Sequence, residues 1–247
     1  MKASPLFSKI HTSASYQDDV DCASYKGVTI KTIILVLITA AVSAIIAFYL
    51  PTIIQNGNLG TYLGVLIGAA IVGFIAVIVG RISDRAAKYA SFIYAVCEGL
   101  SLGFICLICE EYIPGIVPIA VFATLGLLLV MLILFATGII RAGSIFRKVF
   151  IAFVIIALPT VIISILALRF WVTDYQTYMW LIIGIEAIYL LYGTFCLVMN
   201  FGEAQAVVEG GADKNAEWSV ALGLEVTIVY LFVQILRLLL IIMDKKN

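Results

Sequence analysis

The stretch KTIILVLITAAVSAIIAFYLPTIIQNGNLGTYLGVLIGAAIVGFIAVIVGR, from Lys31 to Arg81, decides the fold of this chain. Its 49 interior residues contain no Asp, Glu, Lys or Arg, whereas about 20 apolar residues suffice to cross the hydrocarbon core of a bilayer. Pro51 and the polar run Gln55–Asn58 interrupt it, and both are typical of a helix end or a loop. The sequence therefore predicts two membrane-spanning helices here, near 30–50 and 61–80.

The same pattern continues along the rest of the chain. Residues 1–28 are polar and lack the apolar core of a cleavable signal peptide, so we expect a flexible polar N-terminal tail there. We find no internal repeat and no linker that would separate a second domain. The predicted architecture is all-α, a polytopic membrane protein with one seven-transmembrane-helix domain over 29–247. After the first two helices, further apolar stretches predict helices near 89–109, 114–138, 147–168, 179–199 and 219–243.

The composition excludes several classes of function. The 247 residues are 64% hydrophobic and 12% charged, against about 25% charged in soluble domains, and the mean hydropathy is +1.16. Fifteen Lys and Arg balance fifteen Asp and Glu, which leaves no net positive charge to hold a nucleic acid. The lipid bilayer is the partner that this composition predicts.

Catalytic chemistry is not expected either. The single histidine, His11, lies in the tail, which removes histidine-based metal centres and Ser-His or Cys-His nucleophiles from the membrane region. The sequence contains no HExxH, P-loop, GxSxG or dinucleotide-binding motif. We therefore predict that the chain is not an enzyme and holds no resident cofactor.

Positive charges divide unevenly between the two sides of the predicted bundle. Because positively charged loops stay in the cytoplasm, an excess of eleven against four predicts a cytoplasmic N-terminus. The eleven on the N-terminal side are Lys2, Lys9, Lys26, Lys31, Arg81, Arg85, Lys88, Arg141, Arg147, Lys148 and Lys214, and the four on the other side are Arg169, Arg237, Lys245 and Lys246.

Three acidic residues lie inside predicted membrane helices: Glu98, Glu186 and Glu225. A charged side chain at the centre of a membrane helix costs about 2.5–3.5 kcal/mol on insertion scales, so such residues are candidates for an ion pathway or for pH sensing. Buried carboxyls that approach each other compete for a proton, and their oxygens suit hard cations such as calcium. The alternative is that each is protonated, hydrogen-bonded and purely structural. We expect no cation at mid-depth to pair with them, and we expect Arg237 to reach the far interface or another helix end.

Small residues recur every fourth position in two helices, which predicts close helix packing. One stripe is Gly60, Gly64 and Gly68, and the other is Ser91, Ala95, Gly99 and Gly103. The cysteine pair Cys106 and Cys109 has metal-site spacing, but no second pair or histidine accompanies it, so we expect apolar packing residues and no metal site.

Several short segments resemble, in their order and spacing, the Bax-inhibitor membrane family and in particular its bacterial YccA-like branch. The resemblance covers nearly the whole chain after the tail. The segments are Tyr25–Thr32 (YKGVTIKT), Tyr94–Gly103 (YAVCEGLSLG), Gly138–Arg141 (GIIR), Phe146–Val149 (FRKV), Glu217–Trp218 and Gln234–Leu239 (QILRLL).

The resemblance implies a seven-helix bundle with the C-terminal helix near the centre, in a bacterial inner membrane, and a pH-dependent calcium leak. It also implies a gate of two aspartates, one at the end of the sixth helix and one in the seventh. This chain has Asn200 and Thr227 at those positions. Glu203 and Glu225 lie close by in sequence and are candidates to replace the pair, whereas Glu98 matches its position within the Glu-Gly-Leu run.

Two hypotheses of different classes follow. The first is a proton-regulated cation leak with transient calcium binding, whose pathway passes Glu98, Glu186 and Glu225, with Glu203 near the cytoplasmic exit. The second is a non-conducting interaction protein that regulates other membrane proteins or a membrane protease. The missing aspartates favour the second hypothesis, and the buried acids favour the first.

Overall fold

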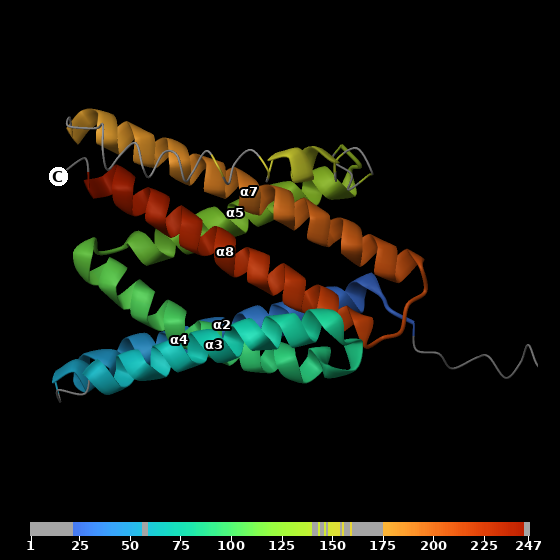
Figure 1. Ribbon diagram of the computed structural model, residues 1–247, viewed down its shortest axis with the longest axis horizontal. Helices are drawn as coiled ribbons and strands as arrows, with labels where there is room; N and C mark the ends of the chain where they lie inside the picture. The colour runs from blue at the N-terminus through green and yellow to red at the C-terminus, as the bar shows by residue number, and fades with distance from the viewer. Residues whose placement is uncertain are drawn as a thin grey trace, which may run out of the picture.

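The computed structural model of the chain describes residues 22–55, 59–139, 143, 146, 148–153, 155, 159 and 175–244. Long helices account for most of them (Figure 1). In chain order these are α2 (Tyr25–Gln55), α3 (Leu59–Ile82), α4 (Asp84–Tyr112), α5 (Ile116–Ala136), α7 (Tyr175–Glu209) and α8 (Ala216–Asp244). The described residues contain no β-strand, only an isolated bridge between Cys22 and Asp213. The predicted all-α class is confirmed.

Each of the six helices contains a segment long and apolar enough to cross a membrane. The polytopic membrane class is therefore confirmed. The helix predicted near 147–168 falls largely outside the described residues, so the count of seven stays a prediction. The six candidate spans are Tyr25–Thr52, Gly60–Ile82, Asp84–Tyr112, Ile116–Ala136, Met179–Glu209 and Ala216–Met243.

Several helices are longer than the hydropathy pattern predicted. Helix α4 begins at Asp84 instead of near 89, and α7 continues ten residues past the predicted end at 199. The prediction that Pro51 interrupts the first helix is wrong, because α2 runs through it to Gln55. A proline removes one backbone N–H donor, and with only four helical residues after it the loss is confined to the last turns.

Helix α8 packs against each of the other five helices, α2, α3, α4, α5 and α7. In Figure 1 it runs diagonally between a group formed by α2, α3 and α4 and a pair formed by α5 and α7. Each of the four buried hydrophobic clusters includes at least one residue of α8. These are Val220, Leu224 and Leu231 in the first cluster, Ile235 and Leu236 in the second, Leu222 in the third and Ala221 in the fourth.

The two stripes of small residues behave differently. On α4, a Cβ atom added to Gly99 would lie 2.7 Å from Cβ of Val42, and one added to Gly103 would lie 2.7 Å from Cβ of Ile46, so α2 and α4 pack backbone to backbone here. On α3, no described atom lies within 4 Å of a Cβ added to Gly60, Gly64 or Gly68. The packing that the spacing predicted for these three glycines is therefore not formed within the described part of the chain, because that face of α3 points away from its neighbours.

The start of the described chain is tied to the turn between α7 and α8. The backbone N–H of Ala23 donates to the carbonyl of Ala212 at 2.9 Å, and both Ala23 and Val28 are buried. The flexible tail predicted over residues 1–28 is therefore too long at its C-terminal end, since Ala23 is held by a backbone hydrogen bond and residues 25–28 already belong to α2. Residues 1–21 of that tail lie outside the described residues.

Candidate functional site

Glu225 lies in the middle of the bundle, on α8. Its side chain is completely buried, and Thr39 of α2 lies 2.7 Å away, measured from its Oγ1 to the Oε1 of Glu225. The same hydroxyl is 3.2 Å from the backbone carbonyl of Ala95 on α4. Three helices therefore meet at this one carboxyl group, and the second carboxyl oxygen, Oε2, has no hydrogen-bond partner among the described atoms.

The Thr39 hydroxyl has one hydrogen, so the direction of these bonds depends on the charge of Glu225. When Glu225 is ionised, the hydroxyl donates to the carboxylate. When Glu225 is protonated, its own O–H can donate to Thr39 Oγ1, and the hydroxyl hydrogen becomes available to the Ala95 carbonyl. A single proton thus reverses a hydrogen bond that joins α2, α4 and α8.

Glu98 of α4 lies close enough to Glu225 for the two carboxyls to interact electrostatically, and Tyr94 interacts with both. Glu98 is half-buried. No lysine or arginine of the described residues forms an ion pair with either acid. The structure therefore places two of the four acids that the sequence singled out within electrostatic range of each other inside the bundle.

Asn200 and Thr227 lie opposite each other on α7 and α8. The amide nitrogen of Asn200 donates to Thr227 Oγ1 at 2.6 Å and to the carbonyl of Gly223 at 3.0 Å. The Thr227 hydroxyl donates back to the same carbonyl at 3.1 Å. At the two positions for which the resemblance implies aspartates, this chain has a hydrogen-bonded pair of neutral side chains that does not titrate.

Glu203 lies one turn beyond Asn200 on α7 and pairs with Arg81 of α3. Oε2 of Glu203 is 2.8 Å from a guanidinium nitrogen of Arg81, and both side chains are 36% exposed. Arg81 also donates to the carbonyl of Ser219 at 3.2 Å. The guanidinium therefore joins α3, α7 and α8, and Glu203 is neutralised here instead of standing free beside Glu225.

Glu186 is separate from the central pair, near the other end of α7. Its side chain is only 3% exposed, and Oε1 lies 2.7 Å from a guanidinium nitrogen of Arg237 on α8. The expectation that no cation pairs with this acid is wrong. Along its own helix Arg237 lies about 18 Å from Glu225, but its side chain reaches across the α7–α8 interface to Glu186.

Sequence reasoning missed Glu217 as a structural centre. Glu217 is 1% exposed in the first turn of α8, and its carboxylate accepts from the Ser24 backbone N–H at 2.7 Å and pairs with Lys31 at 2.7 Å. The ammonium of Lys31 also lies 4.9 Å from the ring centre of Trp218. The signal was an acid at a helix N-terminus, which the helix dipole favours, but its partner lies far away in sequence.

The described residues contain no group of three or more His, Cys, Asp or Glu side chains that could hold a metal ion. All five cysteines are free. Cys109 is buried in a hydrophobic cluster with Ile113 and Ile116. At the centre of the bundle the described arrangement offers carboxyl oxygens from Glu98 and Glu225, together with the Thr39 hydroxyl beside Glu225.

A family model described as Bax inhibitor 1 like matches residues 4–244, nearly the whole chain. Searches of the curated proteins and of the solved structures found no match to the chain.

Proposed function

The chain belongs to the Bax inhibitor 1-like family, and from that premise we propose that it is a proton-regulated cation leak, with calcium as the transported ion. Members of this family are generally non-enzymatic membrane proteins. The buried acids, rather than any nucleophile or cofactor, are then the residues that carry the activity.

The pair formed by Glu98 and Glu225 carries this proposal. Two carboxyls within electrostatic range of each other inside a membrane bundle, with no described cation beside them, are costly to bury, so such residues are functional candidates. Protonation removes their charge and reverses the hydrogen bond to Thr39, whereas deprotonation offers oxygen ligands to a hard cation. Proton and calcium therefore compete for the same oxygens.

At both ends of the proposed pathway, unlike at its centre, an arginine forms an ion pair with the acid. On the cytoplasmic side Arg81 pairs with Glu203, and toward the opposite side Arg237 pairs with Glu186. In this proposal a passing cation displaces a guanidinium at each end. Arg237 is 55% exposed, so its side chain has room to move away.

The finer architecture belongs to the same proposal. We place the chain in the YccA-like branch, as a seven-helix bundle with α8 near its centre, in a bacterial inner membrane with a cytoplasmic N-terminus. The contacts of α8 with five other helices and the excess of Lys and Arg on the N-terminal side support this placement.

The test is calcium entry into liposomes that contain the purified protein, at about pH 6 and about pH 8. We expect a pH-dependent flux that Glu225→Gln makes insensitive to pH and that Glu98→Gln reduces. Glu111→Gln is the matched control, since Glu111 is an exposed acid at the end of α4. A native protein that carries no calcium above empty liposomes at either pH would refute the leak.

One observation favours the second candidate, a non-conducting protein that regulates other membrane proteins or a membrane protease. The positions implied for the aspartate gate form the neutral Asn200–Thr227 pair, which cannot respond to protons. If this candidate is correct, the native chain conducts no calcium, whereas a variant with Asn200→Asp and Thr227→Asp gains a pH-dependent flux. Crosslinking in native membranes then identifies the regulated protein.

A further inference from the structure

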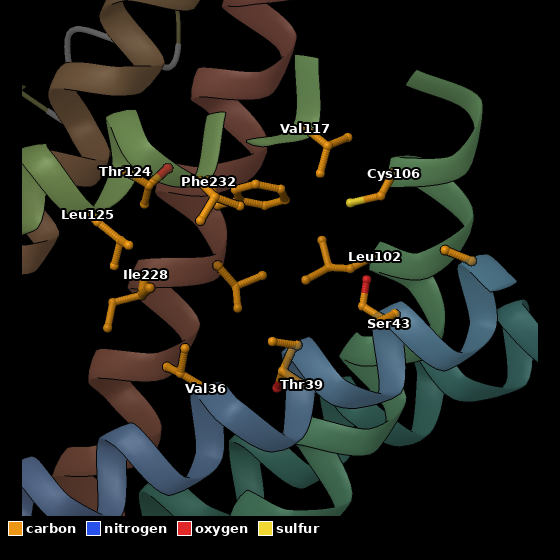
Figure 2. Close-up of a pocket in the computed structure, with 15 residues that line it drawn as sticks. Val36, Thr39, Ser43, Leu102, Cys106, Val117, Thr124, Leu125, Ile228 and Phe232 are labelled. Atoms are coloured by element: carbon orange, nitrogen blue, oxygen red, sulfur yellow. The ribbon is translucent and has the colours of Figure 1, made fainter. Parts of the chain in front are cut away.

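The hollow on one side of α8 offers a cation no free oxygen among the described side chains that line it. It has a volume of about 340 Å³ and lies between α2, α4, α5 and α8 (Figure 2). The rest of its lining is apolar, and its three hydroxyls already have partners: Thr39 with Glu225, Ser43 with Cys106, and Thr124 with the carbonyl of Ala120. A cation that moves along α8 away from the central acids therefore has to find its next ligands on another face of this helix.

The face of α8 that packs against α7 carries polar side chains. Tyr230, Gln234 and Arg237 are four and three residues apart, which places them on one side of the helix. Each of the first two lies two residues beyond a residue that lines the hollow, a rotation of roughly 200° about the helix axis. A Cβ atom added to Gly193 of α7 would lie 2.8 Å from the ring of Tyr230. This polar face therefore meets α7 at close range.

The phenol of Tyr230 joins the polar groups of the two helices. Its hydroxyl donates to the backbone carbonyl of Tyr189 on α7 at 3.2 Å. Because its only hydrogen is used there, its hydrogen bond with the Gln234 side chain is donated by the amide nitrogen of Gln234. Glu186, three residues before Tyr189, interacts electrostatically with the same phenol. We call Glu186, Tyr230, Gln234 and Arg237 the α7–α8 cluster.

Two buried oxygens of the α7–α8 cluster have no hydrogen-bond partner among the described atoms. They are Oε2 of Glu186 and Oε1 of Gln234, in residues that are 3% and 6% exposed. Both atoms are acceptors, so neither satisfies the other while Glu186 is ionised. Leaving a buried acceptor without a partner is costly. The group that completes this cluster is therefore a hydrogen-bond donor or a cation.

Arg237 is a cation of the chain itself that holds only one of these oxygens in place. Its guanidinium lies 2.7 Å from Oε1 of Glu186, and its side chain is 55% exposed while that of Glu186 is buried. On α8 it stands six residues, a rise of about 9 Å, before the span ends at Met243. Long arginine side chains extend from such depths to the membrane surface. The guanidinium can therefore swing outward while the carboxylate stays where it is.

We propose that the α7–α8 cluster is a second cation site, at which Arg237 competes as a tethered cation. When the guanidinium swings out, a hard cation such as calcium binds the carboxylate of Glu186 and Oε1 of Gln234, and water completes its coordination. This inference rests on the proposed function, since it supplies the step by which the same cation enters or leaves on the side opposite the N-terminus. One carboxylate and a competing arginine make the site weak, which suits a pathway because the ion must also leave.

The test is binding of terbium, a luminescent substitute for calcium, to the purified full chain in detergent. Bound terbium emits when a nearby tyrosine is excited, and Tyr230 adjoins the site. We expect Arg237→Gln to bind terbium about tenfold more tightly than the native chain, because a tethered competitor acts at a high effective concentration. Calcium should displace the metal, and adding Glu186→Gln or Gln234→Leu should abolish the gain.

Two further variants make the result decisive. Arg85→Gln is the matched control, because Arg85 is an exposed arginine on α4, and it should bind terbium as the native chain does. Gln234→Glu keeps Arg237 and adds a second carboxylate, so it should also bind terbium more tightly. If circular dichroism and gel filtration show that Arg237→Gln does not fold, Gln234→Glu provides the answer.

Two outcomes overturn the proposal. One is that the folded variants bind terbium no more tightly than Arg85→Gln, which would mean that the unpaired oxygens bind water and not a cation. The other is that the gain is lost with Glu98→Gln and not with Glu186→Gln, which would place the ion at the central acids. Failure of the proposed function looks different: terbium binds at the α7–α8 cluster, but liposomes that contain the native chain take up no calcium.

Discussion

Replacing Lys31 with methionine should destabilise the protein strongly. Methionine keeps the length of the side chain and removes its charge, so Glu217 is left 1% exposed with only the two donors of Ser24, at 2.7 Å and 3.2 Å. Removing one partner of a buried ion pair costs about 3–5 kcal/mol. Lys31 itself is 14% exposed and Ser24 compensates in part, which places the expected loss near 3 kcal/mol.

The assay is thermal unfolding of the purified protein in detergent, followed by circular dichroism. For a chain of this length about 1 kcal/mol shifts Tm by roughly 2–4 °C, so we expect a fall of roughly 6–12 °C. Adding Glu217→Gln to Lys31→Met should restore part of the loss, because the carboxylate without a partner is then gone.

The matched control is Glu203→Gln, which breaks the Arg81 pair with both side chains 36% exposed. Exposed pairs contribute about 0–1 kcal/mol, so its Tm should change by only a few degrees. The reasoning fails if Lys31→Met is no more harmful than this control, or if the double variant is less stable than Lys31→Met alone.

Further predictions concern helix packing, capping and the central hydrogen bond, and each is checked by Tm. Gly99→Ala should cost about 1–3 kcal/mol because the added Cβ overlaps α2. Gly64→Ala, which has no described atom within 4 Å of the added Cβ, should change stability by less than about 1 kcal/mol. Equal effects of the two variants would contradict the close packing of α2 and α4. Glu110→Gln should cost about 1 kcal/mol, since the carboxylate of Glu110 accepts two N–H groups at the start of α5, at 2.7 and 3.1 Å; an unchanged Tm would argue against this cap. Thr39→Val should cost about 1–3 kcal/mol, because it leaves Glu225 without its hydroxyl partner. Thr39→Ser keeps the hydroxyl and should retain most of the stability. If the serine variant is as unstable as the valine variant, the loss comes from packing and not from the hydrogen bond.

The presence of the helices could be predicted from the sequence, but their ends could not. Uninterrupted apolar length is enough to identify a membrane span, as the segment from Lys31 to Arg81 demonstrates. Hydropathy marks where a helix leaves the bilayer and not where its hydrogen bonds stop, so α7 continues to Glu209 as a polar helix. Pro51 illustrates the same point, because the loss of one backbone N–H donor near its end does not terminate α2.

The candidate site could be predicted as a set of residues but not as a set of pairs. Glu98 and Glu225 stand out because acids are rare in membrane spans, and they do lie within electrostatic range of each other. Whether an acid is free or paired depends on which faces of two helices meet, and sequence spacing carries no such information. Arg237 therefore neutralises Glu186 although nothing in either segment indicates it. The two glycine stripes have equal spacing, yet only that of α4 meets a neighbour closely.

The contacts of Glu217 with Ser24 and Lys31 also determine which step of assembly comes last. Ser24 and Glu217 are 193 residues apart, so at about 5–20 residues per second the ribosome needs roughly 10–40 s to supply the acceptor after the donor has emerged. During that time Lys31 has no counter-charge, and the start of α2 is not yet fixed to α8. The closing step of assembly is therefore the arrival of α8, and a chain truncated before it lacks both the counter-charge of Lys31 and the acceptor of the Ser24 N–H.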